Sequence, residues 1–440
     1  MTALDGRRAL SAAVLLAILS GRLAAQETLP ILHAPRPASA VQPLTLEAAK
    51  QRALANNKLL ALAAMNAHGK DLAIQAARAD YFPKIIGTSV YFHFDKPQGT
   101  VITTRGHPLL GLPPMEFTAN VFNQDTNYNL IYAAQPITAL LLVRQGVRIA
   151  EADQQIAEAE LVKGTRAVLM GVEQLYWGLY AAQQIRAGML EAAKQSAPLA
   201  GIDLPDVRIA LLEGKQGLQQ VEDQIADIEE QLNNLLDNPP CTKLEAVEPH
   251  PLTLCVGGAD ELISLAIASS PEVRSAEQDT IKANAALKAA KIDYLPNVAV
   301  LGGVSNQSIA DYIQPDAAFV GVIASYTFVD WGKRRNVLRE RENLVSMASL
   351  KLEQTRDEVR QKALKAFREF DEHRAALKTA QEMVEGRKAA VKKATTPSVM
   401  QNPDPLLKAS KDLMTAEVDL IKADMAVRVS AAQVMSLTGR

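Results

Sequence analysis

The chain has 440 residues, with 47 Lys and Arg against 49 Asp and Glu, so its net charge is −2. That balance excludes a strongly basic nucleic-acid binder and a long acidic tail. The apolar fraction of 48% is too high for a disordered chain, and two cysteines exclude a disulfide-dense scaffold and a cysteine-cluster zinc module. Length alone would suggest about three domains.

The N-terminus has the pattern of a secretory signal. Arg7 and Arg8 precede an uncharged apolar stretch over 9–21, and small residues follow at Ala24 and Ala25. A short membrane anchor is the alternative, but thirteen residues fall short of the roughly twenty that cross a bilayer as a helix. We therefore predict a signal peptide at 1–25, followed by an extended segment at 26–43.

The remainder of the chain is an internal duplication. The segment Asp80-Tyr81-Phe82-Pro83-Lys84 recurs 213 residues later as Asp293-Tyr294-Leu295-Pro296-Asn297. Further along, Tyr176 matches Phe367 at an offset of 191 residues. The two repeats therefore differ in length by 22 residues, and the difference is confined to the segment between these two matches. The predicted domains are a first repeat at 44–237, a Pro-rich linker with both cysteines at 238–258, and a second repeat at 259–440.

Both repeats share one predicted order of elements. An Ala-rich helix ends at a Tyr-x-Pro sequence, because proline stops a helix. Two extended segments follow, then a proline-free stretch that would make a helix of roughly 90 Å, a break rich in Pro and Asp, and a returning helix. The predicted bounds are 46–79, a hairpin over about 85–134, 139–197 and 206–236, and then 260–292, a hairpin over about 296–328, 333–394 and 404–437.

The long helices carry heptad repeats that predict coiled-coil packing. In the second repeat the seam steps by four residues after Ala366 and resumes at Phe370, a stutter that locally unwinds a left-handed supercoil. The seam residues are Leu161, Val168, Leu175, Ala182 and Met189, and then Leu338, Val345, Leu352, Val359, Ala366, Phe370, Leu377, Val384 and Val391.

The four extended segments are predicted at 85–94, 125–134, 296–305 and 319–328, each about as long as the 9–11 residues of a tilted membrane strand. Tyr132 and its neighbours at every second position alternate with polar residues, as in a half-buried strand. Val320, Val322, Ala324, Tyr326 and Phe328 share one parity in the last strand. Soluble hairpins of this length are the alternative.

Four strands cannot close a barrel, and an open edge in lipid leaves unpaired backbone groups. Three copies of the chain would supply twelve strands. Two copies would supply only eight, and side chains nearly fill the interior of an eight-stranded barrel. The long helices carry charges such as Arg334 and Glu340, so they must extend from the membrane into water. The sequence thus predicts a trimeric conduit.

These features resemble the TolC-like outer-membrane efflux proteins, over about 44–439. The resemblance is carried by Leu44-Thr45-Leu46-Glu47-Ala48-Ala49, by Ala79-Asp80-Tyr81-Phe82-Pro83 with its repeat at Tyr294-Leu295-Pro296, and by the run from Thr327 to Arg335, TFVDWGKRR. It implies a mainly α fold with a small β part: a homotrimer with a twelve-stranded outer-membrane β-barrel that continues as a periplasmic coiled-coil tunnel of a Gram-negative bacterium.

The resemblance also implies a function and partners. The chain would be the passive outer-membrane export channel of a tripartite efflux or type I secretion system, docked to a periplasmic adaptor protein and an inner-membrane transporter. Two places depart from the family pattern: 136–140 lacks the usual aromatic and Gly-rich turn, and the turn at 396–404 lacks the usual Gly of the adaptor contact. The alternative function is a soluble periplasmic coiled-coil adaptor or scaffold.

Asp330, Trp331 and Gly332 mark a predicted strand-to-helix interface. Asp330 can cap the following helix, and Trp331 suits the aromatic belt of a membrane. The three basic residues that follow oppose the helix dipole, so anionic lipid heads or neighbouring carboxylates are expected to compensate them. An ordinary solvated charge run is the alternative.

Three aspartates lie in the breaks predicted to form the far tip of the tunnel. Asp203, Asp206 and Asp404 would each be repeated three times in a trimer, which makes them candidates for an acidic ring at a periplasmic gate. Helix capping is the competing interpretation, especially for Asp206 and Asp404.

Cys241 and Cys255 would close a short loop by a disulfide in an oxidising compartment. Two free thiols, or zinc bound with His250, are the alternatives. No catalytic motif, metal site or cofactor site is predicted, so the chain is not expected to be an enzyme. Its expected partners include outer-membrane lipid and exclude nucleic acid, and its cargo is not encoded in any recognisable motif.

Overall fold

A computed structural model describes residues 42–96, 98–104, 115–196, 205–247, 258–310, 313–394 and 404–439. The protein is mainly helical with a small sheet part, which confirms that part of the predicted fold class; the trimer and its twelve-stranded barrel stay predictions. The predicted signal peptide at 1–25, the gate candidate Asp203 and the cysteine at Cys255 lie outside the described residues.

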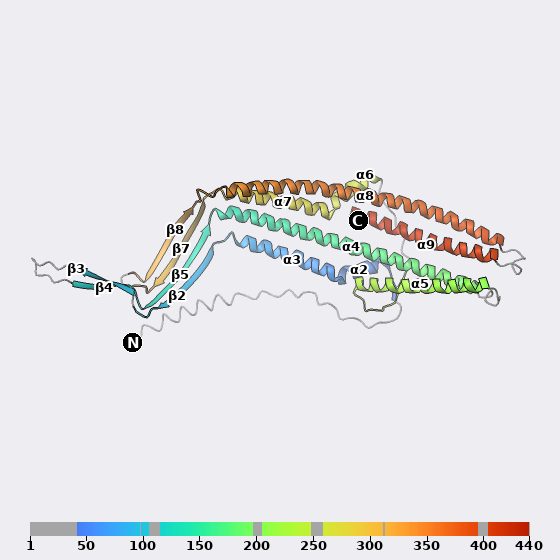
Figure 1. Cartoon of the computed structure of the whole chain (residues 1–440), viewed down its shortest axis with the longest axis horizontal. Coiled ribbons are helices and arrows are strands. Elements are labelled where there is room, and N and C mark those ends of the chain that lie inside the picture. The colour runs from blue at the N-terminus through green and yellow to red at the C-terminus, as the bar shows by residue number, and fades with distance from the viewer. Residues whose placement is uncertain are drawn as a thin grey trace, which may run out of the picture.

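The molecule is elongated, with a sheet at one end and helices running side by side away from it (Figure 1). In each half, a short helix and a returning helix lie alongside one long helix. The short helix lies next to the sheet, and the returning helix lies towards the far end. The helices of the first half are α2 (Leu46–Asn56), α3 (Lys58–Ala79), α4 (Ala139–Ser196) and α5 (Pro205–Leu236). Those of the second half are α6 (Ala259–Ser269), α7 (Pro271–Ile292), α8 (Lys333–Ala394) and α9 (Asp404–Thr438).

The helix predicted at the start of each repeat is two helices. Asn57 ends α2 with extended backbone, and its side chain accepts hydrogen bonds from the N–H groups of Leu59 and Leu60 at the start of α3. Ser270, 213 residues later, separates α6 from α7 in the same way and accepts a hydrogen bond from the N–H of Val273. A capping side chain starts a new helix at each position, because it satisfies N–H groups that a continuous helix would bond internally.

Strands from both repeats form one antiparallel sheet in the order β2-β5-β7-β8. Their bounds are β2 (Lys84–His93), β5 (Asp125–Pro136), β7 (Asn297–Gln307) and β8 (Asp316–Ser325). The last strand was predicted at 319–328 and ends three residues earlier. The cause lies in the neighbouring strand β7. Ser325 pairs with Asn297, the first residue of β7, and the preceding Pro296 has no N–H group that could extend the ladder.

The register separates the two alternating patterns of the sequence. Tyr132 pairs with Gly303, which pairs with Phe319, so these three positions share one face. Val320 and Val322 therefore lie on the opposite face, together with Ile131. Each face of the sheet thus carries one of the two patterns.

Two further strand pairs were not predicted. β3 (Gln98–Thr104) and β4 (Met115–Phe122) pair antiparallel beyond the free end of the main sheet, in a segment expected to be loop (Figure 1). β1 (Gln42–Leu44) pairs parallel with β6 (Leu244–Ala246), which joins the start of the first repeat to the linker.

The duplication extends to the hydrophobic cores. Ala49, Ala53 and Leu60 pack against α4 in one core, and their counterparts 213 residues later, Leu262, Ala266 and Val273, pack against α8 in the other. On the long helices Val168 and Val172 correspond to Val359 and Ala363, at the offset of 191. Each repeat therefore buries an equivalent core, near the middle of its long helix.

Candidate functional site

The sheet has two edges without a partner among the described residues. β2 pairs only with β5, and β8 pairs only with β7. Such edges expose a row of backbone N–H and C=O groups that can pair with another chain. Because β2 and β8 belong to different repeats, one edge of the sheet comes from each half of the duplication.

A close approach of backbones holds the two halves of the sheet together. Gly303 of β7 sits opposite Tyr132 of β5, and a Cβ at this glycine would lie 2.6 Å from the Cβ of Tyr132 and would clash with the carbonyl oxygen of Ile131. Any other residue would force β5 and β7 apart. The seam between the repeats therefore requires glycine here.

Asp330 organises the passage from β8 to α8. One carboxylate oxygen accepts a hydrogen bond from the N–H of Gly332 at 3.0 Å, and the other accepts one from the N–H of Arg334 at 3.1 Å. These bonds, that from Arg334 first, hold the pKa of Asp330 below its ordinary value. The structure thus places Asp330 as the capping residue of α8.

The two residues after Asp330 turn the chain through positive φ. Trp331 has a φ of 55° and Gly332 a φ of 85°. This conformation is ordinary for glycine and costs a bulky residue about 1 kcal/mol or more. Trp331 is also 95% exposed in the single chain, so its contacts with the described residues offset little of that cost.

Arg334 has two partners next to this turn. Its guanidinium lies 5.1 Å from the centre of the Tyr326 ring, and its Nε is 3.5 Å from a carboxylate oxygen of Asp330. Tyr326 in turn packs edge to face with Phe328. Arg334 is therefore tied to the junction, whereas neither Lys333 nor Arg335 has an ion pair in the described part of the chain.

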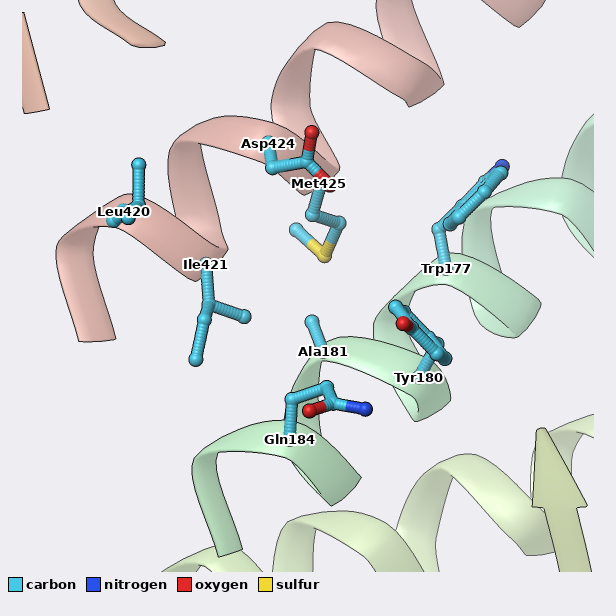
Figure 2. A pocket seen from close by; sticks show the side chains of 8 residues that line it. All are labelled: Trp177, Tyr180, Ala181, Gln184, Leu420, Ile421, Asp424 and Met425. Atoms are coloured by element: carbon cyan, nitrogen blue, oxygen red, sulfur yellow. The ribbon is translucent and has the colours of Figure 1, made fainter. Parts of the chain in front are cut away.

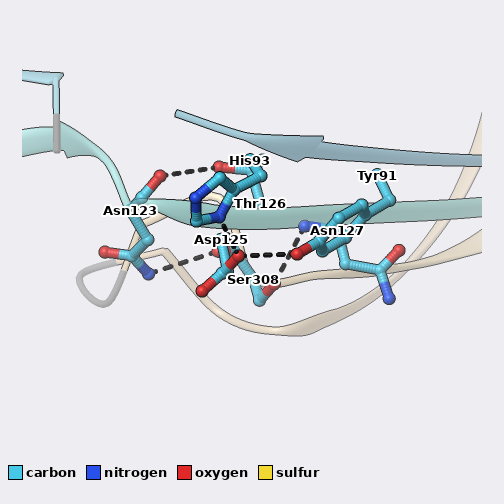
Figure 3. A network of polar contacts seen from close by, with 7 residues as sticks. All are labelled: Tyr91, His93, Asn123, Asp125, Thr126, Asn127 and Ser308. Carbon is cyan, nitrogen blue, oxygen red and sulfur yellow. Dashed lines mark hydrogen bonds and ion pairs between the residues drawn. The ribbon is translucent and has the colours of Figure 1, made fainter. Parts of the chain in front are cut away.

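At the opposite end of the sheet, a polar network links three of the strands and their loops (Figure 3). A carboxylate oxygen of Asp125 lies 2.6 Å from the hydroxyl of Tyr91 and 2.8 Å from Nδ1 of His93. Asn123 and Asn127 bond to Ser308, which follows β7. The sequence did not reveal this network, because Asp125 meets His93 only through the β2–β5 register.

A small hollow lies between α4 and α9 (Figure 2). Its volume is about 220 Å³. At its edge the guanidinium of Arg428 stacks 4.5 Å from the ring centre of Trp177 and forms an ion pair with Asp424 at 2.7 Å. The lining residues are Trp177, Tyr180, Ala181, Gln184, Leu420, Ile421, Asp424 and Met425.

The gate candidates are only partly described. Asp206 and Asp404 lie in the first turns of α5 and α9, at the far end of the molecule from the sheet (Figure 1), and nothing is described of their side chains. Asp203 lies outside the described residues. Whether the three form a ring stays a prediction.

Cys241 is exposed, has a φ of 63° and is a free cysteine in the structure. Cys255 lies outside the described residues, so the disulfide remains a prediction. Within the part of the chain that the structure describes, no three His, Cys, Asp or Glu side chains gather as metal ligands would. None of the described helices has an apolar stretch long enough to cross a bilayer.

Comparison with known families gives one match. Residues 262–440, which are most of the second repeat, match the family model described as outer membrane efflux protein. No curated protein matches the chain.

Comparison with solved structures finds the same fold over most of the chain, between 89% and 95% of it in three of the matches. The outer membrane protein VceC of Vibrio cholerae is 15% identical, with 89% of this chain and 96% of VceC covered and a TM-score of 0.71. The MtrE outer membrane channel of Neisseria gonorrhoeae is 14% identical, with 95% and 97% covered and a TM-score of 0.72. A membrane protein of Pseudomonas aeruginosa is 16% identical, with 92% and 99% covered and a TM-score of 0.73.

Proposed function

We propose that the chain is a member of the outer membrane efflux protein family, whose model matches its second repeat, and that it forms the passive outer-membrane channel of an export system. The supporting observation is the composite sheet, in which the free edges β2 and β8 belong to different repeats and the long helices leave from the same end. A closed sheet needs both edges paired, and further copies of the chain offer the complementary edges.

Three copies give a wall of twelve strands, enough to enclose a water-filled passage. The helices then continue from the wall as a tube of roughly 90 Å, since α4 has 58 residues and α8 has 62. The strands lie in the outer membrane and the helices in the periplasm. This arrangement leads solutes through the periplasm and across the outer membrane. The family whose model matches the second repeat is one of channel proteins.

The channel itself conducts solutes passively and does not supply the energy for export. A periplasmic adaptor and an inner-membrane transporter supply the work, and the far tip opens for them. At that tip Asp203, Asp206 and Asp404 form the acidic ring that favours cations. In planar bilayers, Asp404→Ala should reduce cation selectivity; unchanged selectivity would remove Asp404 from the gate.

Reconstitution tests the channel itself. Purified protein in mild detergent should have three times the mass of one chain and should give stepwise conductance in a planar bilayer. Cell fractionation should place it in the outer membrane. A monodisperse monomer that gives no conductance and fractionates with soluble periplasmic proteins would reject the proposal.

A further inference from the structure

We propose that the β8–α8 junction binds the headgroup of an anionic phospholipid, an inference that rests on the proposed outer-membrane function. The residues concerned form the junction patch, which we define as Phe328, Trp331, Lys333, Arg335 and Arg339. The patch combines exposed aromatic rings with basic side chains at the point where the sheet meets the helices (Figure 1).

The aromatic part of the junction patch is poorly covered by its own chain. Phe328 is 88% exposed and Trp331 is 95% exposed. The positive φ of Trp331 carries a conformational cost that contacts with the described part of the chain do little to offset. Aromatic side chains in such a position are suited to the headgroup level of a bilayer, where one part of the ring is apolar and the other wet.

The basic part of the junction patch has an unbalanced charge. From Lys333 to Glu342 the helix carries five basic and two acidic side chains, and its first turn has no acidic residue. Arg335 and Arg339 are one turn apart on the same exposed face, and no ion pair to either is found in the described part of the chain. Like charges at this spacing, and positive charge near a helix N-terminus, both destabilise α8 unless an anion is present.

The helix N-terminus itself does not require that anion. Asp330 already accepts hydrogen bonds from the N–H groups of Gly332 and Arg334. The uncompensated charge is therefore on the side chains of Lys333, Arg335 and Arg339. Phosphates bound by these side chains lie outside the helix, at the surface of the protein, and Arg335 and Arg339, which share a face, can bind the same one.

The neighbouring copy offers little to neutralise this charge. If β8 pairs with β2 of the next copy, the junction patch approaches the turn between α3 and β2. The carboxylate at that turn, Asp80, is 3.1 Å from Nζ of Lys84, so it already has a cation. The bilayer, in contrast, supplies phosphate groups at this level, and each basic side chain near an anionic lipid surface strengthens binding by about fivefold.

The two tryptophans make the proposal measurable. Trp331 is in the junction patch, whereas Trp177 is buried, lines the hollow between α4 and α9, and lies 38 residues, or about 57 Å, beyond the start of α4. We would reconstitute the full-length protein in nanodiscs that contain either brominated phosphatidylglycerol or brominated phosphatidylethanolamine, and titrate the quenching of tryptophan fluorescence. Trp331→Phe gives the residual signal of Trp177.

We expect half-maximal quenching of Trp331 at a mole fraction of brominated phosphatidylglycerol at least about fivefold lower than that of brominated phosphatidylethanolamine, since fivefold is the effect of a single basic side chain. The variant Lys333→Gln/Arg335→Gln/Arg339→Gln should reduce this preference to about onefold. The control Arg368→Gln/Arg374→Gln/Lys378→Gln removes the same charge from exposed positions on α8 about 50 Å along the helix and should keep the preference.

Equal quenching by the two lipids in the unmodified protein would overturn the proposal, even if the triple variant failed to fold. A preference that survives the triple variant would overturn it as well. Both results leave the channel function standing, because either brominated lipid at the junction quenches Trp331. An absence of quenching by both lipids would contradict the placement of the sheet in a bilayer, and the proposal with it.

Discussion

The hydroxyl oxygen of Tyr176 lies 2.9 Å from the backbone carbonyl oxygen of Leu44, which ends β1, and 2.5 Å from that of Val247, which follows β6. One side chain of α4 thus holds both strands of the parallel pair that joins the start of the first repeat to the linker. The ring is fully buried in the first core. The matching position in the second repeat is Phe367, which has no hydroxyl, so this link belongs to the first repeat alone.

Removing the hydroxyl of Tyr176 should destabilise the middle of the molecule. Tyr176→Phe removes one O–H donor from this place; the carbonyl of Leu44 keeps the N–H of Val247, so we expect a loss of about 0.5–1.5 kcal/mol in the free energy of unfolding. Thermal unfolding in detergent, followed by circular dichroism, measures the effect. Tyr81→Phe, at the exposed end of α3, is the control and should change the midpoint little; equal midpoints for the two variants would contradict the account.

The same hydroxyl predicts a pH dependence. Burial raises the pKa of Tyr176 to about 12, above the value near 10 of an unfolded chain. Folding therefore favours the protonated phenol, so its stabilising contribution is complete below about pH 10 and is lost as the pH rises from about 10 to about 12. Over that window the unmodified protein should lose more thermal stability than Tyr176→Phe. Parallel losses would show that the phenol does not titrate in this way.

The turn before α8 should accept only glycine at position 332. Gly332 has a φ of 85°, so Gly332→Ala should lower the free energy of unfolding by about 1 kcal/mol or more. Gly386→Ala is the matched control, because Gly386 is inside α8 with open space around it and alanine favours helix there by about 0.5–1 kcal/mol. Denaturant titration should move the two variants in opposite directions. Stabilisation by both would mean that the turn is not built as described.

The seam between the repeats should be equally intolerant. Gly303→Ala places a methyl group against the backbone of β5 and should prevent the four strands from forming one sheet. We expect a loss of conductance and of the trimer in detergent. Gly321→Ala in β8, where an added Cβ would meet nothing within 4 Å, should leave both intact. Normal channels from Gly303→Ala would refute the close approach.

Sequence reasoning was most successful where one rule decides the structure. Without proline, the helix predicted over 139–197 runs as α4 from Ala139 to Ser196, and that predicted over 333–394 is α8. The breaks at Asn57 and Ser270 were missed although their signals were present, since both are good capping residues and Pro271 follows Ser270 at a helix start.

Features that depend on strand register could not be predicted from the sequence. The two alternating patterns fall on opposite faces because Tyr132, Gly303 and Phe319 are aligned, and no local signal encodes that alignment. The contact between His93 and Asp125 needs the same information. At the junction, the sequence predicted the cap by Asp330 but not the positive φ of Trp331, because bulky residues rarely adopt it.

Pairing between the sheet edges of different copies is the central claim, and oxidative cross-linking tests it most directly. In a Cys241→Ser/Cys255→Ser background, Gly321→Cys in β8 would be combined with one cysteine at each position from 85 to 91 in β2. Ser89→Cys/Asn129→Cys is the control, because these residues are paired within the chain and their side chains lie 2.6 Å apart.

The account predicts that at least one β2–β8 combination yields a covalent trimer on a denaturing gel, while the control oxidises within the monomer. If the control oxidises but every β2–β8 combination yields only monomer, edge pairing between copies is contradicted.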